Sequence, residues 1–162
     1  MIKVTLKDDE ASAALGRLAA SLTDLSTPME KIGNALSRST KDRMLRGETP
    51  DGGAFAPRSP NTLRKYERRK VSPRGGPLDL TGSMIRGIFH HAGSDSVTVG
   101  SNASQAAVMH FGADMGAFGA NRRGGPIPWG PIPARPFLGL SSEDRTAIQK
   151  IVARWLGEAV EG

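Results

Sequence analysis

Residues 132–140 read IPARPFLGL, and this stretch restricts the possible folds more than any other part of the chain. Pro133 and Pro136 lack a backbone N–H and have a fixed φ angle, so the stretch fits neither a helix interior nor a central strand. It nevertheless carries apolar side chains that favour burial, Phe137 among them. We therefore expect an edge strand or an extended strap that Phe137 fixes to the sheet or to the last helix, with Arg135 reaching a carboxylate or a carbonyl.

Helical periodicity predicts two helices near the N-terminus and one at the C-terminus. Leucines recur at helical spacing after Asp9, and residues 27–30 (TPME) combine an N-cap threonine, a proline at the first helical position and a capping-box carboxylate. Gly47 is placed to end the second helix. Because the connection between these two helices is short, we expect a helical hairpin. Apolar residues from 148 to 160 predict an amphipathic helix that begins near Ser141.

Alternation with a period of two predicts three short strands. Residues 2–6 (IKVTL) alternate at the N-terminus, and residues 85–91 and 96–100 are expected to form an antiparallel hairpin. The length of 162 residues fits a single domain over residues 1–162. The predicted fold class is α+β: a small antiparallel sheet packed by an N-terminal helical hairpin and a C-terminal amphipathic helix, with long Gly/Pro-rich arms.

Two segments rich in glycine and proline interrupt this pattern. Residues 47–77 are expected to form a loop with a short basic helix over residues 61–70. Residues 113–131 have no sustained periodicity, so we expect a mobile arm in the isolated monomer. Phe118 and Trp129 lie in this arm, where exposed aromatic side chains either fold back on the domain or dock on a partner.

The positive charge of the chain is concentrated around the short helix, whose start is marked by Ser59 and Pro60. The net charge is +6, and the cations of one segment, less the single Glu67, account for all of it. These cations, called the basic patch, are Arg58, Arg64, Lys65, Arg68, Arg69, Lys70 and Arg74. Such a patch attracts phosphate, an acidic protein surface or anionic lipid, unless it is merely a solvated helix face.

The sequence contains no set of residues that indicates an enzyme, a metal site or a cofactor. There are no cysteines, which excludes disulfides and thiolate-bound metals. His90 and His91 are adjacent on a predicted strand, so their side chains point to opposite faces and cannot share a metal. Ser83 lacks the flanking glycines of a nucleophile elbow, and no glycine cluster follows a strand and opens a helix. No apolar run is long enough for a membrane span, and we expect a soluble protein made in the cytoplasm.

Nucleic-acid binding is the alternative that the residues themselves leave open. Tyr66 lies inside the basic run from Arg64 to Lys70, and Arg122 with Arg123 adds a smaller positive patch. Sequence-specific RNA readers and single-strand binders use several aromatic side chains as a stacking platform, whereas Tyr66 is the only tyrosine here. Only non-specific attraction to phosphate is therefore predicted.

Five sequence blocks occur in a characteristic order along the chain. They are PDGGAFAPRSPNTL (50–63), LDLTGSMIRGI (78–88), SVTVGSN (96–102), QAAVMHFGA (105–113) and IPARPFLGLSSED (132–144). Taken together, they resemble the phage virion-morphogenesis, or tail-completion, family of Mu-like and related contractile- and long-tailed phages. The leucine-threonine-glycine block and the arginine-proline-phenylalanine-leucine block are its specific parts. The resemblance spans residues 28–160.

This resemblance implies a structural protein of the virion at the head–tail junction, assembled in the cytoplasm of the host bacterium. Such proteins complete or terminate the tail tube and enable head joining, and similar tail terminators are α+β proteins that form rings, often hexamers. The implied partners are further copies of the chain, the tail tube protein and the head–tail connector proteins, with non-specific contact to packaged DNA through the basic patch. A head-completion (stopper) ring protein is the close alternative. The expected contact residues are Phe118, Trp129, Arg135 and Phe137.

Overall fold

The computed structural model describes residues 9–161, so the strand expected over residues 2–6 lies outside the described part. Within that part the predicted α+β class is confirmed, with helices packed on a two-stranded antiparallel sheet. The helices are α1 (Asp9–Ser21), α2 (Ser26–Arg46), α3 (Pro60–Arg69), α4 (Ser83–Arg86), α5 (Ala106–Phe111) and α6 (Ser142–Glu161), and the strands are β1 (Ile88–Ala92) and β2 (Val97–Ser101).

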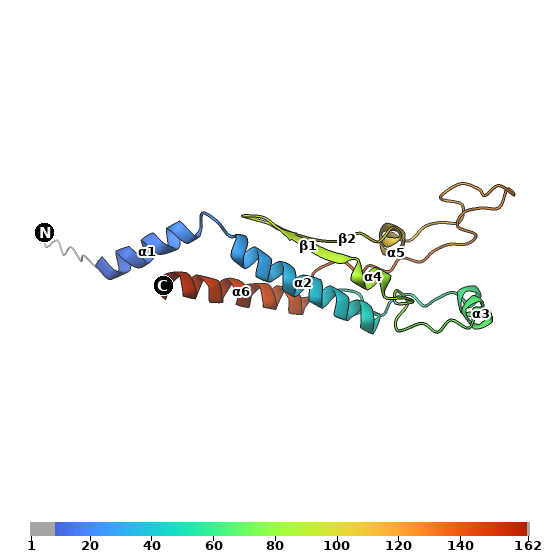
Figure 1. The fold of residues 1–162 in the computed structure, drawn as a ribbon, viewed down its shortest axis with the longest axis horizontal. Helices are drawn as coiled ribbons and strands as arrows, with labels where there is room; N and C mark the ends of the chain where they lie inside the picture. The colour runs from blue at the N-terminus through green and yellow to red at the C-terminus, as the bar shows by residue number, and fades with distance from the viewer. Residues whose placement is uncertain (1–8, 162) are drawn as a thin grey trace, which may run out of the picture.

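The sheet is the predicted hairpin, and one of its faces packs on α2 (Figure 1). Its register pairs Ile88 with Ser101 and His90 with Val99. Phe89 points to the opposite face and is exposed. β1 begins later than predicted because the single turn of α4 occupies the residues just before it. Neither β1 nor β2 has another strand beside its outer edge within residues 9–161.

The expected N-terminal helical hairpin is not formed, and this is the main correction to the predicted architecture. α1 and α2 run in the same general direction along the molecule, and each packs on α6 instead of on the other (Figure 1). The connection between them is held to the sheet, because the Leu25 N–H donates to the carbonyl of Ser94 at 2.8 Å. The apolar stripe of α1 therefore finds its partner in the C-terminal helix, which the sequence spacing alone could not identify.

Local signals at helix ends were predicted more accurately. Gly47 ends α2 in the left-handed conformation with φ 79°, and the Ser59 side chain caps α3 by accepting from the Thr62 N–H. Thr27, however, does not cap α2, because the helix already begins at Ser26 and its N-cap position has no side-chain hydrogen bond. The side chain of Asp24 instead accepts from the Ser26 N–H at 2.8 Å.

The core lies where α2, α4, β1 and the segment after residue 132 meet. Phe137 is 1% exposed and sits among Met44 of α2, Met84 of α4 and Ile88 of β1, together with Phe55 and Leu78 from the loops on either side of α3. Residues 133–138 form neither strand nor helix, so the edge strand is absent, and Phe137 fixes this segment, called the strap, to the core. The strap is fastened by the Arg135 N–H, which donates to the carbonyl of Met109 at 2.8 Å.

Candidate assembly surface

Residues 113–131 form a hairpin-like arm that projects from one end of the molecule (Figure 1). At its base, Ala113 and Ile132 exchange two backbone hydrogen bonds of 2.9 and 2.7 Å. Further along, the Phe118 N–H donates to the Ile127 carbonyl at 2.8 Å. The arm thus has a defined backbone path, although it contains no regular strand. Its mobility in the isolated monomer remains a prediction.

The tip of the arm is closed by Asn121. Its side-chain oxygen accepts from the backbone N–H of Arg123 at 2.8 Å and of Gly125 at 3.1 Å, which satisfies the donors of a tight turn. Gly124 adopts a φ of 77°, a conformation that favours glycine. Both Arg122 and Arg123 are exposed at this tip.

The arm presents large apolar side chains to solvent. Phe118 is 55% exposed and Trp129 is 79% exposed, so neither folds back into the domain. Met115 and Ile127 are also exposed, and Phe111 lies just before the arm with its ring exposed. The sequence analysis singled out only the aromatic residues within the arm, because isolated aliphatic side chains in a loop carry no periodic signal. An exposed group of this kind is typical of an interaction surface.

Arg135 and Phe137, which the sequence analysis placed among the contact residues, lie inside the subunit. Arg135 is 6% exposed, and its guanidinium donates to the carbonyls of Ala56 at 2.6 Å and Pro57 at 2.7 Å. Burial, and then repulsion from Arg58, lower the pKa of Arg135. This side chain joins the base of the arm to the start of the basic segment, so it positions both.

The ring of His110 packs edge-on against Phe137, with the ring centroids 5.2 Å apart. Burial lowers the pKa of His110 below its ordinary value. Its Nδ1 is buried and has no hydrogen-bond partner within the described residues. The neutral form therefore fits this apolar place at the base of the arm better than the protonated form.

The basic patch divides into a structural part and an exposed part. Arg58 is half-buried and donates to three main-chain carbonyls, those of Gly75, Gly76 and Asp79. Its charge is therefore used to hold the loop before α4. The side chains that remain exposed are Arg64, Lys65, Arg68, Arg69, Lys70 and Arg74, which lie on α3 or in the loop after it. α3 and the arm project at the same end of the molecule (Figure 1).

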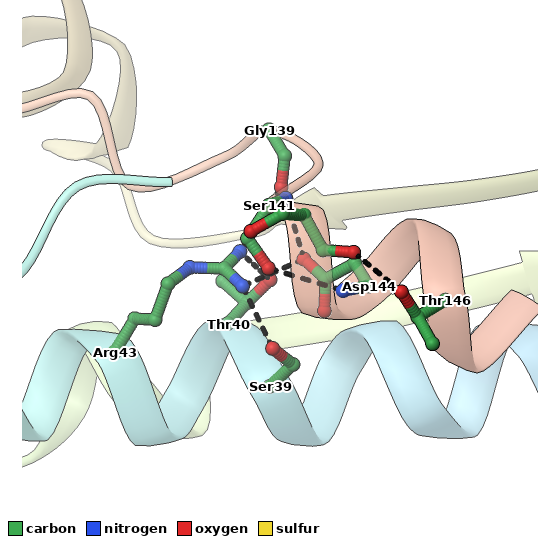
Figure 2. A network of polar contacts seen from close by, with 8 residues as sticks. Ser39, Thr40, Arg43, Gly139, Ser141, Asp144 and Thr146 are labelled. Carbon is green, nitrogen blue, oxygen red and sulfur yellow. Dashed lines mark hydrogen bonds and ion pairs between the residues drawn. The ribbon is translucent and has the colours of Figure 1, made fainter. Parts of the chain in front are cut away.

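A buried polar network fixes α6 and the strap relative to α2 (Figure 2). Ser141 and Asp144 form a reciprocal cap, in which the Ser141 N–H donates to Asp144 Oδ2 at 2.9 Å and the Asp144 N–H donates to Ser141 Oγ at 3.1 Å. Arg43 donates to the same carboxylate at 2.7 Å and to the Gly139 carbonyl at 3.0 Å. Burial favours a higher pKa for Asp144, but hydrogen bonds from Ser39, Ser141 and Arg43 outweigh burial and lower it.

His90 and His91 point to opposite faces of the sheet, as predicted. Nε2 of His90 lies 3.0 Å from the Glu30 carboxylate, and its Nδ1 lies 3.2 Å from the Ser37 hydroxyl, whereas His91 is exposed. The hydrogen bond with His90 lowers the pKa of Glu30. Among residues 9–161 there is no group of three metal-binding side chains. Nor does that part of the chain contain a helix that is long and apolar enough to cross a membrane.

Comparison with known proteins identifies one family. A family model described as the phage virion morphogenesis family matches residues 6–157, which is nearly the whole chain. The chain matches no curated protein and no solved structure.

Proposed function

The chain belongs to the phage virion morphogenesis family and so has a structural role in phage assembly; we propose that it is a tail-completion, or tail-terminator, protein of the head–tail junction. In this role, copies of the chain assemble into a ring that ends the tail tube and offers a docking surface to the head connector. The ring is proposed to be a hexamer, and its partners to be the tail tube protein and the connector proteins.

The observation that carries this proposal is the exposed arm. A subunit that leaves Phe118 and Trp129 exposed on a projecting hairpin gains free energy when a neighbour or the tail tube covers these side chains. The low hydrophobic content of 38% is consistent with a subunit whose apolar contacts are completed in the assembly. Arg135 and Phe137 support the arm from inside the subunit, so their proposed contribution to assembly is indirect.

Shortening the arm tests the mechanism. Replacing residues 115–129 by an Asn-Gly turn keeps the paired base at Ala113 and Ile132. We expect virions made with this variant to show unjoined heads and tails in electron micrographs. The single change Trp129→Ser should reproduce part of the defect, whereas Leu63→Ser, an exposed leucine on α3, serves as its control. Normal ring formation and tail joining by the shortened protein would contradict the proposal.

A second candidate function is supported by the exposed cations of α3. These cations are proposed to contact packaged DNA through its phosphates, without reading its sequence. Duplex binding should then weaken steeply as salt rises, and alanine at Arg64, Arg68 and Arg69 should lower the slope of log K against log salt by about one unit per lost contact. Absence of any duplex binding at low salt would remove this candidate.

A further inference from the structure

An apolar groove lies on the other half of the molecule from the arm. It has a volume of about 470 Å³, within the range of roughly 300–1,000 Å³ that is usual for clefts that hold a ligand. It is bounded by α2, by β2, by the end of the strap and by α6. Most of its lining is apolar and includes Met29, Ile32, Leu36, Val97, Leu138 and Ile148. No other strand beside β2 covers the groove within residues 9–161.

The arm of the same subunit is at the wrong end of the molecule to fill this groove. Figure 1 shows the hairpin turn between β1 and β2 and the start of α2 next to the end of α1, on the half of the long axis away from the arm and α3. One side of the groove is lined by Met29 from that start of α2 and by Asp95 from that turn. The apolar arm and the apolar groove therefore lie apart on one subunit, and the arm of a subunit does not cover its own groove.

The charges at the two ends are complementary. The segments around the arm, residues 56–77 and 112–131, contain nine lysines and arginines against two carboxylates, a net charge of +7. The segments toward the other end of the molecule, residues 9–31 and 93–96, contain five carboxylates against two cations, a net charge of −3. Asp95 lines the groove itself, and the tip of the arm carries exposed Arg122 and Arg123. Opposite charges of this kind orient two copies end to end.

We propose that the apolar groove receives the arm of a second copy of this chain, with Trp129 and Phe118 covered by the groove and the arginines of the tip near Asp95. The inference rests on the proposed assembly into a ring and names the surface that each arm contacts. A contact between two different surfaces of identical subunits is heterologous, and it closes into a ring when the rotation between neighbours allows closure. A single type of contact is therefore sufficient to build the assembly.

Cysteine cross-linking tests the pairing directly, because the natural chain contains no cysteine and has no background of disulfides. The test variant carries Trp129→Cys in the arm and Val97→Cys in the groove. The matched control carries Trp129→Cys with Leu45→Cys, an exposed residue of α2 that does not line the groove. Each variant replaces the natural protein in the phage, and purified virions are oxidised and analysed without reductant.

With the test variant we expect a ladder of covalent products in steps of one 17.1 kDa subunit, and with the control a single band. Virions that contain the protein at the junction but give no ladder would overturn the inference while leaving the proposed function intact. Virions in which the protein is absent from the junction would overturn the proposed function itself. A ladder of equal strength from the control would also overturn the inference, because the cross-link would then not depend on the groove.

Charge reversal provides an independent readout on the same contact. Asp95→Arg should reduce the yield of infectious particles at least tenfold, and Arg122→Asp combined with Arg123→Asp should do the same. Joining the three changes in one chain should restore much of the yield, since the opposite charges then face each other again in reversed order. If every variant folds normally by circular dichroism and the combined variant still gives a reduced yield of infectious particles, the tip of the arm does not contact Asp95.

Discussion

Arg43 and Asp144 meet inside the subunit although 101 residues separate them, with Nη1 of Arg43 2.7 Å from Oδ2 of Asp144. Both side chains are buried, and Arg43 also holds the Gly139 carbonyl at the end of the strap. The contact therefore sets the position of the first turn of α6 and of the strap relative to α2. Because the base of the arm continues directly into the strap, this pair also determines from which side of the core the arm leaves.

Removing one partner of this pair should be strongly destabilising. Arg43→Ala or Asp144→Ala leaves a buried charge without its counter-ion, and such changes cost roughly 3–5 kcal/mol of unfolding free energy. The exposed pair of Lys31 and Glu158 at 3.7 Å is the internal control, because Glu158→Ala should cost about 1 kcal/mol or less. Urea denaturation measures both. Similar losses from the two pairs would show that burial of the Arg43 contact contributes little.

Replacement by alanine should change the stability of the protein in opposite directions at two helical glycines, Gly33 and Gly16. A Cβ on Gly33 would lie 2.3 Å from Cδ2 of His90, so Gly33→Ala pushes α2 away from β1 and should cost about 1–3 kcal/mol. Gly16 has open space around it in α1, and Gly16→Ala should stabilise the protein by about 0.5–1 kcal/mol through helix propensity. Thermal unfolding of the two variants compares them. A stabilised Gly33→Ala protein would contradict the close approach of helix and strand.

Phe137→Ala should remove about 3–5 kcal/mol of unfolding free energy, because it empties a fully buried position at the centre of the core. Phe137→Leu should cost less, since it keeps most of the apolar contact. Urea denaturation distinguishes the two substitutions. If the alanine variant lost under 1 kcal/mol, the strap would not be held by this side chain.

Arg135→Ala should affect folding as well as assembly. It removes the donor to the part-buried carbonyls of Ala56 and Pro57, at a cost of at most about 1–3 kcal/mol, the range for fully buried unsatisfied groups. Residues 56–77 should then become more sensitive to trypsin, whose target residues are plentiful there. Arg154→Ala, on the exposed side of α6, is the control. Unchanged cleavage of residues 56–77 would mean that other contacts, such as those of Arg58, are sufficient to hold the segment.

Short-range features of this fold could be predicted from the sequence, because the residues that cause them are neighbours. The Ser59 cap, the glycine that ends α2 and the β1–β2 hairpin each depend on a few consecutive residues. The partner of α1 and the contact between Arg43 and Asp144 depend instead on residues over a hundred positions apart. The sequence position of Asp144, in the first turn of the last helix, does not indicate a distant arginine as its partner.

In the candidate assembly surface, too, only the features that depend on neighbouring residues could be predicted from the sequence. Phe118 and Trp129 were identified as contact candidates because aromatic side chains in a Gly/Pro-rich segment are conspicuous. Arg135 and Phe137 were grouped with them, yet their burial could be seen only once the strap was placed against the core. The groove is assembled from α2, β2, the strap and α6, so no continuous stretch of sequence contains its pattern.

Acidification from about pH 7.5 to pH 5.5 should lower the stability of the subunit through His110. Burial holds the folded-state pKa of His110 below its ordinary value, so the unfolded chain binds more protons in this range and the unfolding free energy falls as the pH falls. The His110→Gln variant has no group that titrates at this position. Its unfolding free energy should therefore fall less than that of the natural protein over the same pH range. Urea denaturation at several pH values measures both proteins, and identical slopes from pH 6.5 downward would show that the ring beside Phe137 accepts a proton without cost.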